Sequence, residues 1–312
     1  IIIFSNKSFD YKMINLSYSG ENNINSKENI KDSLLRILII YSLLSILILT
    51  LLNVSGLRLF NSLNMSMTLV SGGGFLPTDK LDKIISSNFQ KIILIFSLII
   101  SMLNFYFLFN FFNKKILFKE HREDFYLIML SFLFCIFIYF DNNKGLDIII
   151  SVISSLANSG LTLVKSDNNL SLYFLLITIV GGSLISNTSG IKLTRFYILL
   201  KITSSEIIKL ISPNSVINKT IYNSEKKISD ENVKVSFLIF ISFFLSLFIL
   251  SSLLVLDNIG FEKSFKLSIL TLTNTVNSEM FNMQNINFTN LLTSSKISLI
   301  LFMIIGKIEL IS

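Results

Sequence analysis

Long apolar runs alternate with polar segments along this chain. Six runs are long enough, or nearly so, to cross about 30 Å of hydrocarbon, and they cover residues 34–54, 92–112, 125–140, 171–200, 235–256 and 297–311. The third run is short, and the fourth is broken by Gly181, Gly182 and a polar stretch that reaches Gly190. The pattern therefore predicts an all-α integral membrane protein that crosses the bilayer at least six times.

Three shorter apolar segments lie between successive pairs of these runs, at residues 57–75, 145–161 and 264–281. Each is typical of a short helix that ends in a turn containing Gly or Asn, which suits a re-entrant hairpin buried within protein. The order of span, half-helix, turn and span therefore occurs three times, with a period of roughly 80 to 110 residues. Such repetition indicates pseudosymmetry around an axis.

The repeat and the polar segments divide the chain into five parts. We expect a cytoplasmic linker at 1–30, membrane repeats at 31–115 and 116–202, a second cytoplasmic linker at 203–232, and a last membrane repeat at 233–312. With the half-helices placed outside, the inner segments carry 17 Lys and Arg residues and the outer ones carry 9. Because cytoplasmic loops collect Lys and Arg, this count predicts that every half-helix lies on the external face.

Composition agrees with a membrane protein and excludes several other classes. Hydrophobic residues make up 51% of the 312 residues and charged residues only 15%, so membrane lipids are the expected surroundings. The net charge of +7 comes from Lys and Arg in short loops, a distribution that argues against a nucleic-acid partner. The single cysteine, Cys135, excludes a disulfide framework or a Cys-rich metal site. His121, the only histidine, is expected to be a solvated loop residue, and it has no partners for a Ser-His or His-metal enzyme.

Two small, polar turns are candidates for an ion filter. The first contains Ser71, Gly72, Gly73 and Gly74, and the second, at the equivalent place in the next repeat, contains Asn158, Ser159 and Gly160. Glycine allows positive φ and lets carbonyl groups face a common axis. Carbonyl oxygens arranged in that way can replace the hydration shell of potassium. The first turn alone favours an ordinary Gly-rich turn, but two turns at equivalent places shift the balance toward a filter.

The motifs around these turns resemble those of Trk-type potassium-uptake transporters. The stretch from Gly56 to Leu63, the turn 71–75 and the later Leu103-Asn104-Phe105 are similar to the second repeat of that family. The segment 181–195, Gly-Gly-Ser-Leu-Ile-Ser-Asn-Thr-Ser-Gly-Ile-Lys-Leu-Thr-Arg, resembles the family's "G-G-x-x-x-S-T-x-G-G-I-K-x-x-R" in the third repeat. The end, from Ile305 to Leu310, resembles its "L-G-R-L-E" in the fourth. The chain is therefore expected to be a fragment covering repeats two to four, with the fourth clipped.

The resemblance implies a role for each motif. The residues of the third-repeat segment would form an intramembrane gate loop below the filter; they are Gly181, Gly182, Ser183, Ser186, Asn187, Thr188, Ser189 and Gly190. Unwound polar backbone at membrane depth supports that role independently, because it is tolerated only where it lines a cavity or is buried in protein. Lys307 would take the place of the family's arginine near the pore, although a lysine lacks the planar fork of arginine.

The last filter quarter departs from the family pattern. Where the resemblance leads us to expect "I-N-N-x-G-P", we align Asn277, Ser278, Glu279 and Met280, so that Met280 stands in place of a glycine. Either the register of this alignment is off, or an acidic side chain lies near the ion path and weakens selectivity.

By resemblance, the fold is a pseudo-fourfold array of helix, pore-helix and helix units around a cation pore, with potassium held at backbone carbonyls and no other cofactor. The family implies transport rather than enzymatic catalysis, a location in the inner (plasma) membrane, a homodimer, and a cytosolic nucleotide-binding regulatory subunit. Two alternatives stay open. The chain could serve a variant permeable to both sodium and potassium, or it could be a decayed, non-conducting remnant.

Overall fold

The computed structural model describes the following residues: 30–78, 80–105, 107–108, 121–139, 145–164, 168–212, 219–223, 227–275, 280–283 and 291–308. Within these ranges the regular structure is helical, and the one extended pairing is an antiparallel bridge between Thr220 and Lys227. The predicted all-α class is therefore confirmed.

The first unit consists of α2 (Ile30–Val54), α3 (Leu59–Ser71), the 3-10 turn η1 (Leu81–Lys83) and α4 (Asn88–Met102). The short helix α3 packs against both longer helices. Helix α4 begins with a capping box, in which the Ser87 side chain accepts from the Gln90 N–H and the Gln90 side chain accepts from the Ser87 N–H. This reciprocal pair satisfies backbone donors that the first helical turn leaves free.

The second unit consists of α7 (Arg122–Tyr139), α8 (Gly145–Leu156), α9 (Asn168–Val180) and α10 (Leu193–Ile211). Here the short helix α8 packs against α7 and α9. The long apolar run predicted at 171–200 is thus two helices, separated by a non-helical loop between Val180 and Leu193.

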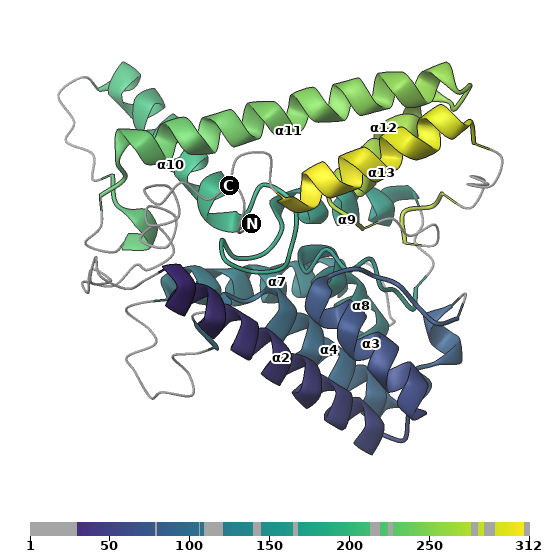
Figure 1. The fold of residues 1–312 in the computed structure, drawn as a ribbon. Coiled ribbons are helices and arrows are strands. Elements are labelled where there is room, and N and C mark those ends of the chain that lie inside the picture. Colours follow the sequence, from purple (N-terminus) through teal and green to yellow (C-terminus); the bar gives the residue numbers. More distant parts are fainter. Residues whose placement is uncertain are drawn as a thin grey trace.

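The third unit follows the 3-10 turn η2 (Ile221–Asn223) and contains α11 (Asp230–Leu256), α12 (Phe261–Leu272) and α13 (Thr293–Ile308). The short α12 packs against α11 and α13. Each of the three units therefore repeats one plan, a short helix held between longer ones (Figure 1). This is the repeat that the apolar pattern predicts.

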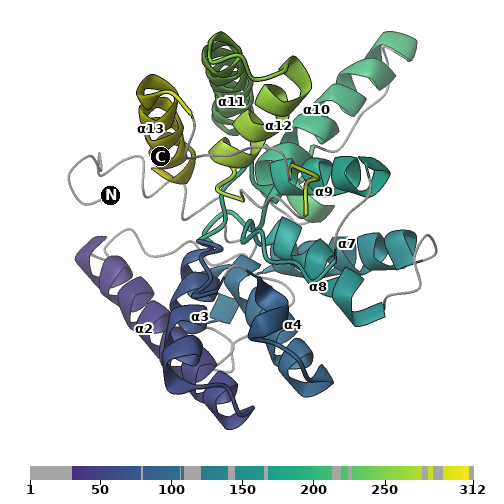
Figure 2. The same cartoon turned by 90° about the vertical axis from the view of Figure 1, so that its right-hand side faces the viewer.

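The three units surround a common centre, as Figure 2 shows. Contacts between α4 and α8, and between α9 and α12, join neighbouring units. The loop between α9 and α10, drawn in teal, lies between the first unit and the third (Figure 1).

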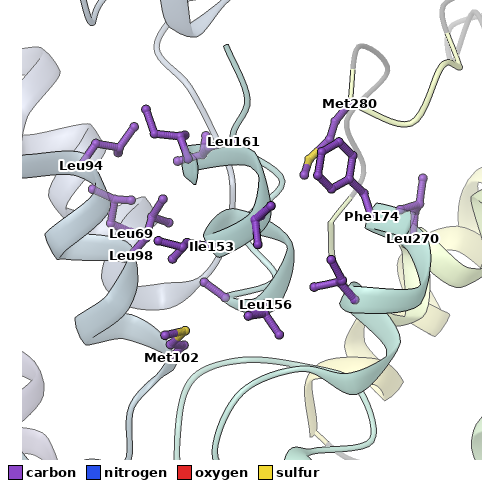
Figure 3. Packing of buried hydrophobic residues seen from close by; sticks show 14 of the residues in the cluster. Leu69, Leu94, Leu98, Met102, Ile153, Leu156, Leu161, Phe174, Leu270 and Met280 are labelled. Atoms are coloured by element: carbon purple, nitrogen blue, oxygen red, sulfur yellow. The ribbon is translucent and has the colours of Figure 1, made fainter. Parts of the chain in front are cut away.

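Apolar side chains occupy both the interior and the outer surface. Leu69 of α3, Leu98 of α4 and Ile153 of α8 belong to one buried cluster (Figure 3). On the outside, α11 exposes Phe237, Leu245, Phe248 and Ile249. Residues 37–54 of α2 and the whole of α11 are long and apolar enough to cross a membrane. An apolar exterior around an apolar core is what a lipid environment requires, since lipid tails do not penalise exposed apolar groups.

Candidate ion pathway and gate loop

The three short helices end in the same backbone motif. A left-handed residue lies just beyond each helical end, directly after α3 at Gly72 (φ 61°) and one residue later after α8 and α12, at Asn158 (53°) and Asn274 (56°). Glycine adopts this conformation freely, and asparagine tolerates it better than most residues. The N–H of the next residue then bonds to a carbonyl five positions back, as in a Schellman motif; these bonds run from Gly73 to Thr68 (3.0 Å), from Ser159 to Ser154 (3.0 Å) and from Thr275 to Leu270 (2.9 Å).

The turns after these helices touch one another through their backbones. Gly74 and Gly160 each lie two residues after the left-handed position, and both have positive φ themselves. A Cβ atom on Gly74 would collide with the carbonyl oxygen of Ser159, and one on Gly160 would lie 3.0 Å from the carbonyl oxygen of Thr275. Each glycine therefore allows its turn to approach the turn of the next unit.

The shared motif identifies the third turn as the one at Thr273, Asn274 and Thr275, a few residues before the stretch selected from sequence. Of that stretch, Asn277, Ser278 and Glu279 lie outside the described residues. Met280 is fully buried in the main apolar cluster, beside Phe174 (Figure 3). Its side chain therefore packs in the core.

Two asparagine side chains connect the turns to neighbouring helices. The Asn158 amide donates to the carbonyls of Thr178 (3.1 Å) and Thr273 (3.3 Å). The Asn274 amide donates to the carbonyl of Met303 on α13 at 3.1 Å. The same residues that adopt the left-handed conformation therefore also hold the units together. Sequence analysis missed Asn274, although an Asn just after an apolar half-helix was a signal that could have found it.

The predicted gate loop is the non-helical segment between α9 and α10. Gly181 (φ 70°), Gly190 (φ 88°) and Lys192 (φ 74°) reverse the chain at its two ends. A Cβ on Gly190 would lie 2.9 Å from the Ile179 carbonyl oxygen, so the two ends lie close together. The Ser183 N–H donates to the Met102 carbonyl at 3.1 Å, which places the loop against the end of α4.

Lys192 organises the loop from within. Its side chain is 1% exposed, and its ammonium group donates to the carbonyls of Ser186 (3.2 Å) and Thr188. The hydroxyl groups of Ser186 and Thr188 are 2.8 Å apart. Buried charge is costly unless hydrogen bonds compensate it, and here the polar residues of the loop supply those bonds. Sequence analysis placed Lys192 inside the family motif without giving it a role.

The loop contacts the end of the first short helix. The Asn187 amide donates to the Val70 carbonyl at 2.6 Å. Lys307, from the far end of the chain, donates to the carbonyls of Ser71 (2.8 Å) and Asn187 (2.6 Å). Helix α13 reaches this place because Gly306 has no side chain, since a Cβ there would collide with the Leu272 carbonyl oxygen of α12.

A buried acidic pair, which sequence analysis did not select, supports the base of the loop. At the start of α7, Glu123 accepts from the Leu184 N–H (2.9 Å) and Asp124 accepts from the Asn104 N–H (2.8 Å). Both carboxyl groups are almost fully buried. The expectation for His121 was wrong, because its side chain is 1% exposed and its ring meets Phe107 edge-on at 5.5 Å.

The chemistry offered at the turns is that of backbone carbonyl oxygens and hydroxyl groups. Among the described residues, no group of three His, Cys, Asp or Glu side chains is placed to hold a metal ion. Neutral oxygens of this kind are suited to a weakly held monovalent cation.

Comparison with known proteins places this architecture in context. No protein-family model matches the sequence. The chain is 29% identical, over 187 residues, to an uncharacterized cation transporter of Methanocaldococcus jannaschii, a match that covers 58% of this chain and 38% of the relative. The structure of the present chain resembles the crystal structure of the potassium transporter TrkH from Vibrio parahaemolyticus. The TM-score is 0.81 and the identity 20%, and the match covers 92% of this chain and 64% of TrkH.

The chain thus spans less than two thirds of either protein. The predicted resemblance to Trk-type transporters is confirmed at the level of the fold: this is an all-α membrane protein of repeated helix, re-entrant helix and helix units.

Proposed function

We propose that this chain forms three units of a transmembrane pathway for potassium uptake. The observation that carries the proposal is the convergence of three identically capped short helices, whose following turns pack backbone against backbone at Gly74 and Gly160. The similarity to a cation transporter and the TrkH-like fold support cation transport over enzymatic catalysis.

In this proposal the filter is built from the carbonyl groups of the three turns. Its residues are Ser71, Gly72, Gly73 and Gly74 in the first unit, Asn158, Ser159 and Gly160 in the second, and Thr273, Asn274 and Thr275 in the third. A potassium ion loses its water as carbonyl oxygens replace it, and then moves down its electrochemical gradient.

The gate is the loop from Gly181 to Gly190. Its Asn187 lies against the end of α3, and Lys307 binds both the loop and the Ser71 carbonyl. A cation leaving the turns would meet this ammonium group, so we infer that the arrangement is an occluded one. Opening requires the loop to release Val70 and Lys307.

Ion uptake by the full natural protein in potassium-starved, uptake-deficient cells tests the proposal, with rubidium as tracer and sodium as competitor. Rubidium entry that sodium barely inhibits is the expected result. Absence of entry from a well-expressed protein would contradict the proposal and favour a non-conducting remnant.

A pathway permeable to both sodium and potassium is the second candidate. In the first and second units, a glycine (Gly74 or Gly160) lies two residues after the left-handed residue. The equivalent position in the third unit, two residues after Asn274, is Val276. Val276 lies outside the described residues, but its identity alone means that the third unit lacks the glycine of the first and second. Sodium-dominated uptake in the same assay, restored to rubidium preference by Val276→Gly, would establish this second candidate.

The family resemblance further suggests an inner-membrane homodimer that rests on a cytosolic nucleotide-binding regulatory subunit. The basic segments on the predicted inner side would provide contacts for that subunit. Deleting Thr203 to Asn232 should then abolish its co-purification with the transporter, while unchanged co-purification would remove the idea.

A further inference from the structure

Tyr222 occupies an unusual position in the linker between α10 and α11. It lies in the 3-10 turn η2 with a left-handed backbone (φ 49°, ψ 37°), and its side chain is only 3% exposed. Its ring is stacked between Tyr126 of α7, with centroids 5.0 Å apart, and Tyr197 of α10, at 4.4 Å. A non-glycine residue in this conformation costs free energy, so the surroundings must hold it there.

The linker around Tyr222 is held by hydrogen bonds within itself and by one ion pair to α10. Thr220 and Lys227 form the antiparallel bridge, and the Ile228 N–H donates to the Lys219 carbonyl at 2.8 Å. Lys219 also pairs with Glu206 of α10 at 2.9 Å. A second apolar cluster, separate from the main core, then buries this part of the linker; it consists of Ile198, Ile221, Tyr222 and Ile228.

Two polar contacts connect Tyr222 to the membrane helices. Its hydroxyl group lies 3.1 Å from the Thr194 hydroxyl, and its carbonyl accepts from the Arg122 guanidinium group at 3.1 Å. Burial raises the pKa of the Tyr222 hydroxyl well above its usual value, so this group keeps its proton at physiological pH.

These partners are next to the residues that hold the gate loop. Thr194 is two residues beyond Lys192, which binds the loop from within. Arg122 precedes Glu123, which accepts from Leu184 of the loop and also interacts with Thr194. The linker and the gate loop thus contact the same small region, which consists of Thr194 and the first turn of α7.

We propose that Tyr222 couples the linker between α10 and α11 to the gate loop, so that a displacement of the linker changes how firmly Thr194 and the base of the loop are held. This regulatory role rests on the proposed function of the loop as a gate. A force applied to the linker, for example by a bound regulatory protein, would act on the loop through the Tyr222 hydroxyl and ring without touching the ion path.

The test compares Tyr222→Phe, Thr194→Val and the double variant in the full natural protein. Each removes one hydroxyl from the same pair, and Tyr222→Phe keeps the ring stack. The matched control is Tyr173→Phe, on α9, whose ring meets Phe137 edge-on away from the linker. Hydrogen exchange of the peptide covering residues 181–192 is the first readout, and basal rubidium flux is the second.

Loss of the shared hydrogen bond in Tyr222→Phe should increase both exchange of the loop and basal flux about fivefold. Thr194→Val should have at least this effect, because it also loses the contact with Glu123, and the double variant should show no more than Thr194→Val alone. The control should leave both unchanged. Unaltered exchange in Tyr222→Phe, or effects that add fully in the double variant, would overturn the coupling. Because exchange reports on the loop without ion transport, a wild-type protein that conducts nothing would contradict only the proposed function.

Discussion

The ammonium group of Lys307 lies 2.6 Å from the carbonyl oxygen of Asn187, although 120 residues separate them in the chain. The same group donates to the Ser71 carbonyl at 2.8 Å. One side chain from α13 thus joins the proposed gate loop of the second unit to the proposed filter turn of the first. This contact makes Lys307 the residue whose replacement should most directly change the resting state of the gate.

Replacing Lys307 by methionine should raise basal cation flux by at least about tenfold, since each lost hydrogen bond from a charged donor contributes about 1.5–3 kcal/mol. Rubidium flux into liposomes containing the purified full protein measures this. Lys263→Met, at an exposed position on α12, controls for the loss of a positive charge. A flux that falls in Lys307→Met would contradict the gate-closing role.

Alanine at Gly74 should abolish uptake, because its Cβ would collide with the Ser159 carbonyl oxygen. At Gly160 the contact would be 3.0 Å, so alanine there should reduce uptake less. Gly56 provides the matched control, since it also has positive φ but nothing lies within 4 Å of its Cβ position. All three changes incur the left-handed penalty of about 1–2 kcal/mol.

The three variants share this backbone penalty, whereas the steric conflict with the next turn grows from Gly56→Ala through Gly160→Ala to Gly74→Ala, and the loss of transport should follow the same order. We expect uptake by Gly56→Ala to stay within about twofold of wild type, measured per molecule of folded protein. The reason is that the backbone penalty is smaller than the roughly 5–15 kcal/mol of stability typical of proteins, so the variant still folds. Equal loss of uptake in all three would show that packing between the turns does not decide conduction.

Met280→Ala should destabilise the protein by about 2–5 kcal/mol through the cavity it leaves, with little effect on the preference for rubidium over sodium. The reason is that the Met280 side chain is fully buried in the main apolar cluster (Figure 3). Thermal unfolding in detergent and competitive uptake measure the two effects separately. A large change in ion preference at unchanged stability would show that Met280 contributes to the filter.

Ser87→Ala should lower stability by about 1 kcal/mol, because the N-cap of α4 loses its side-chain acceptor. Gln90→Ala should cost more, since its side chain also donates to the Ser55 carbonyl at 3.2 Å and so connects α4 to the end of α2. Thermal unfolding of the two variants checks this order. The reverse order would show that the hydrogen bond from Gln90 to Ser55 does not contribute to the stability of the fold.

Much of the fold follows from local pattern. Apolar runs of spanning length, three short apolar segments and the small residues after them predict the helices, the repeat and two of the three turns. Local signals of this kind are reliable because hydrophobic length and left-handed turns depend on neighbouring residues. The break in the fourth apolar run between Val180 and Leu193 was likewise visible from glycines and polar residues within one continuous segment.

Relationships between distant segments could not be predicted in the same way. The turn at Asn274 was not selected from the sequence, because it lacks the glycines of the other two turns and its left-handed asparagine is a weaker local signal. His121 was expected in solvent, although it packs against Phe107.

The sequence by itself determined the class, the repeat and the candidate turns of this protein, because each depends on the order of apolar and polar residues along the chain. Only the tertiary structure decided that Gly74 meets Ser159, that Lys307 meets Asn187 and that Tyr222 meets Thr194. Such pairs arise from the packing of whole helices, and no spacing within the sequence encodes which carbonyl a distant side chain will reach.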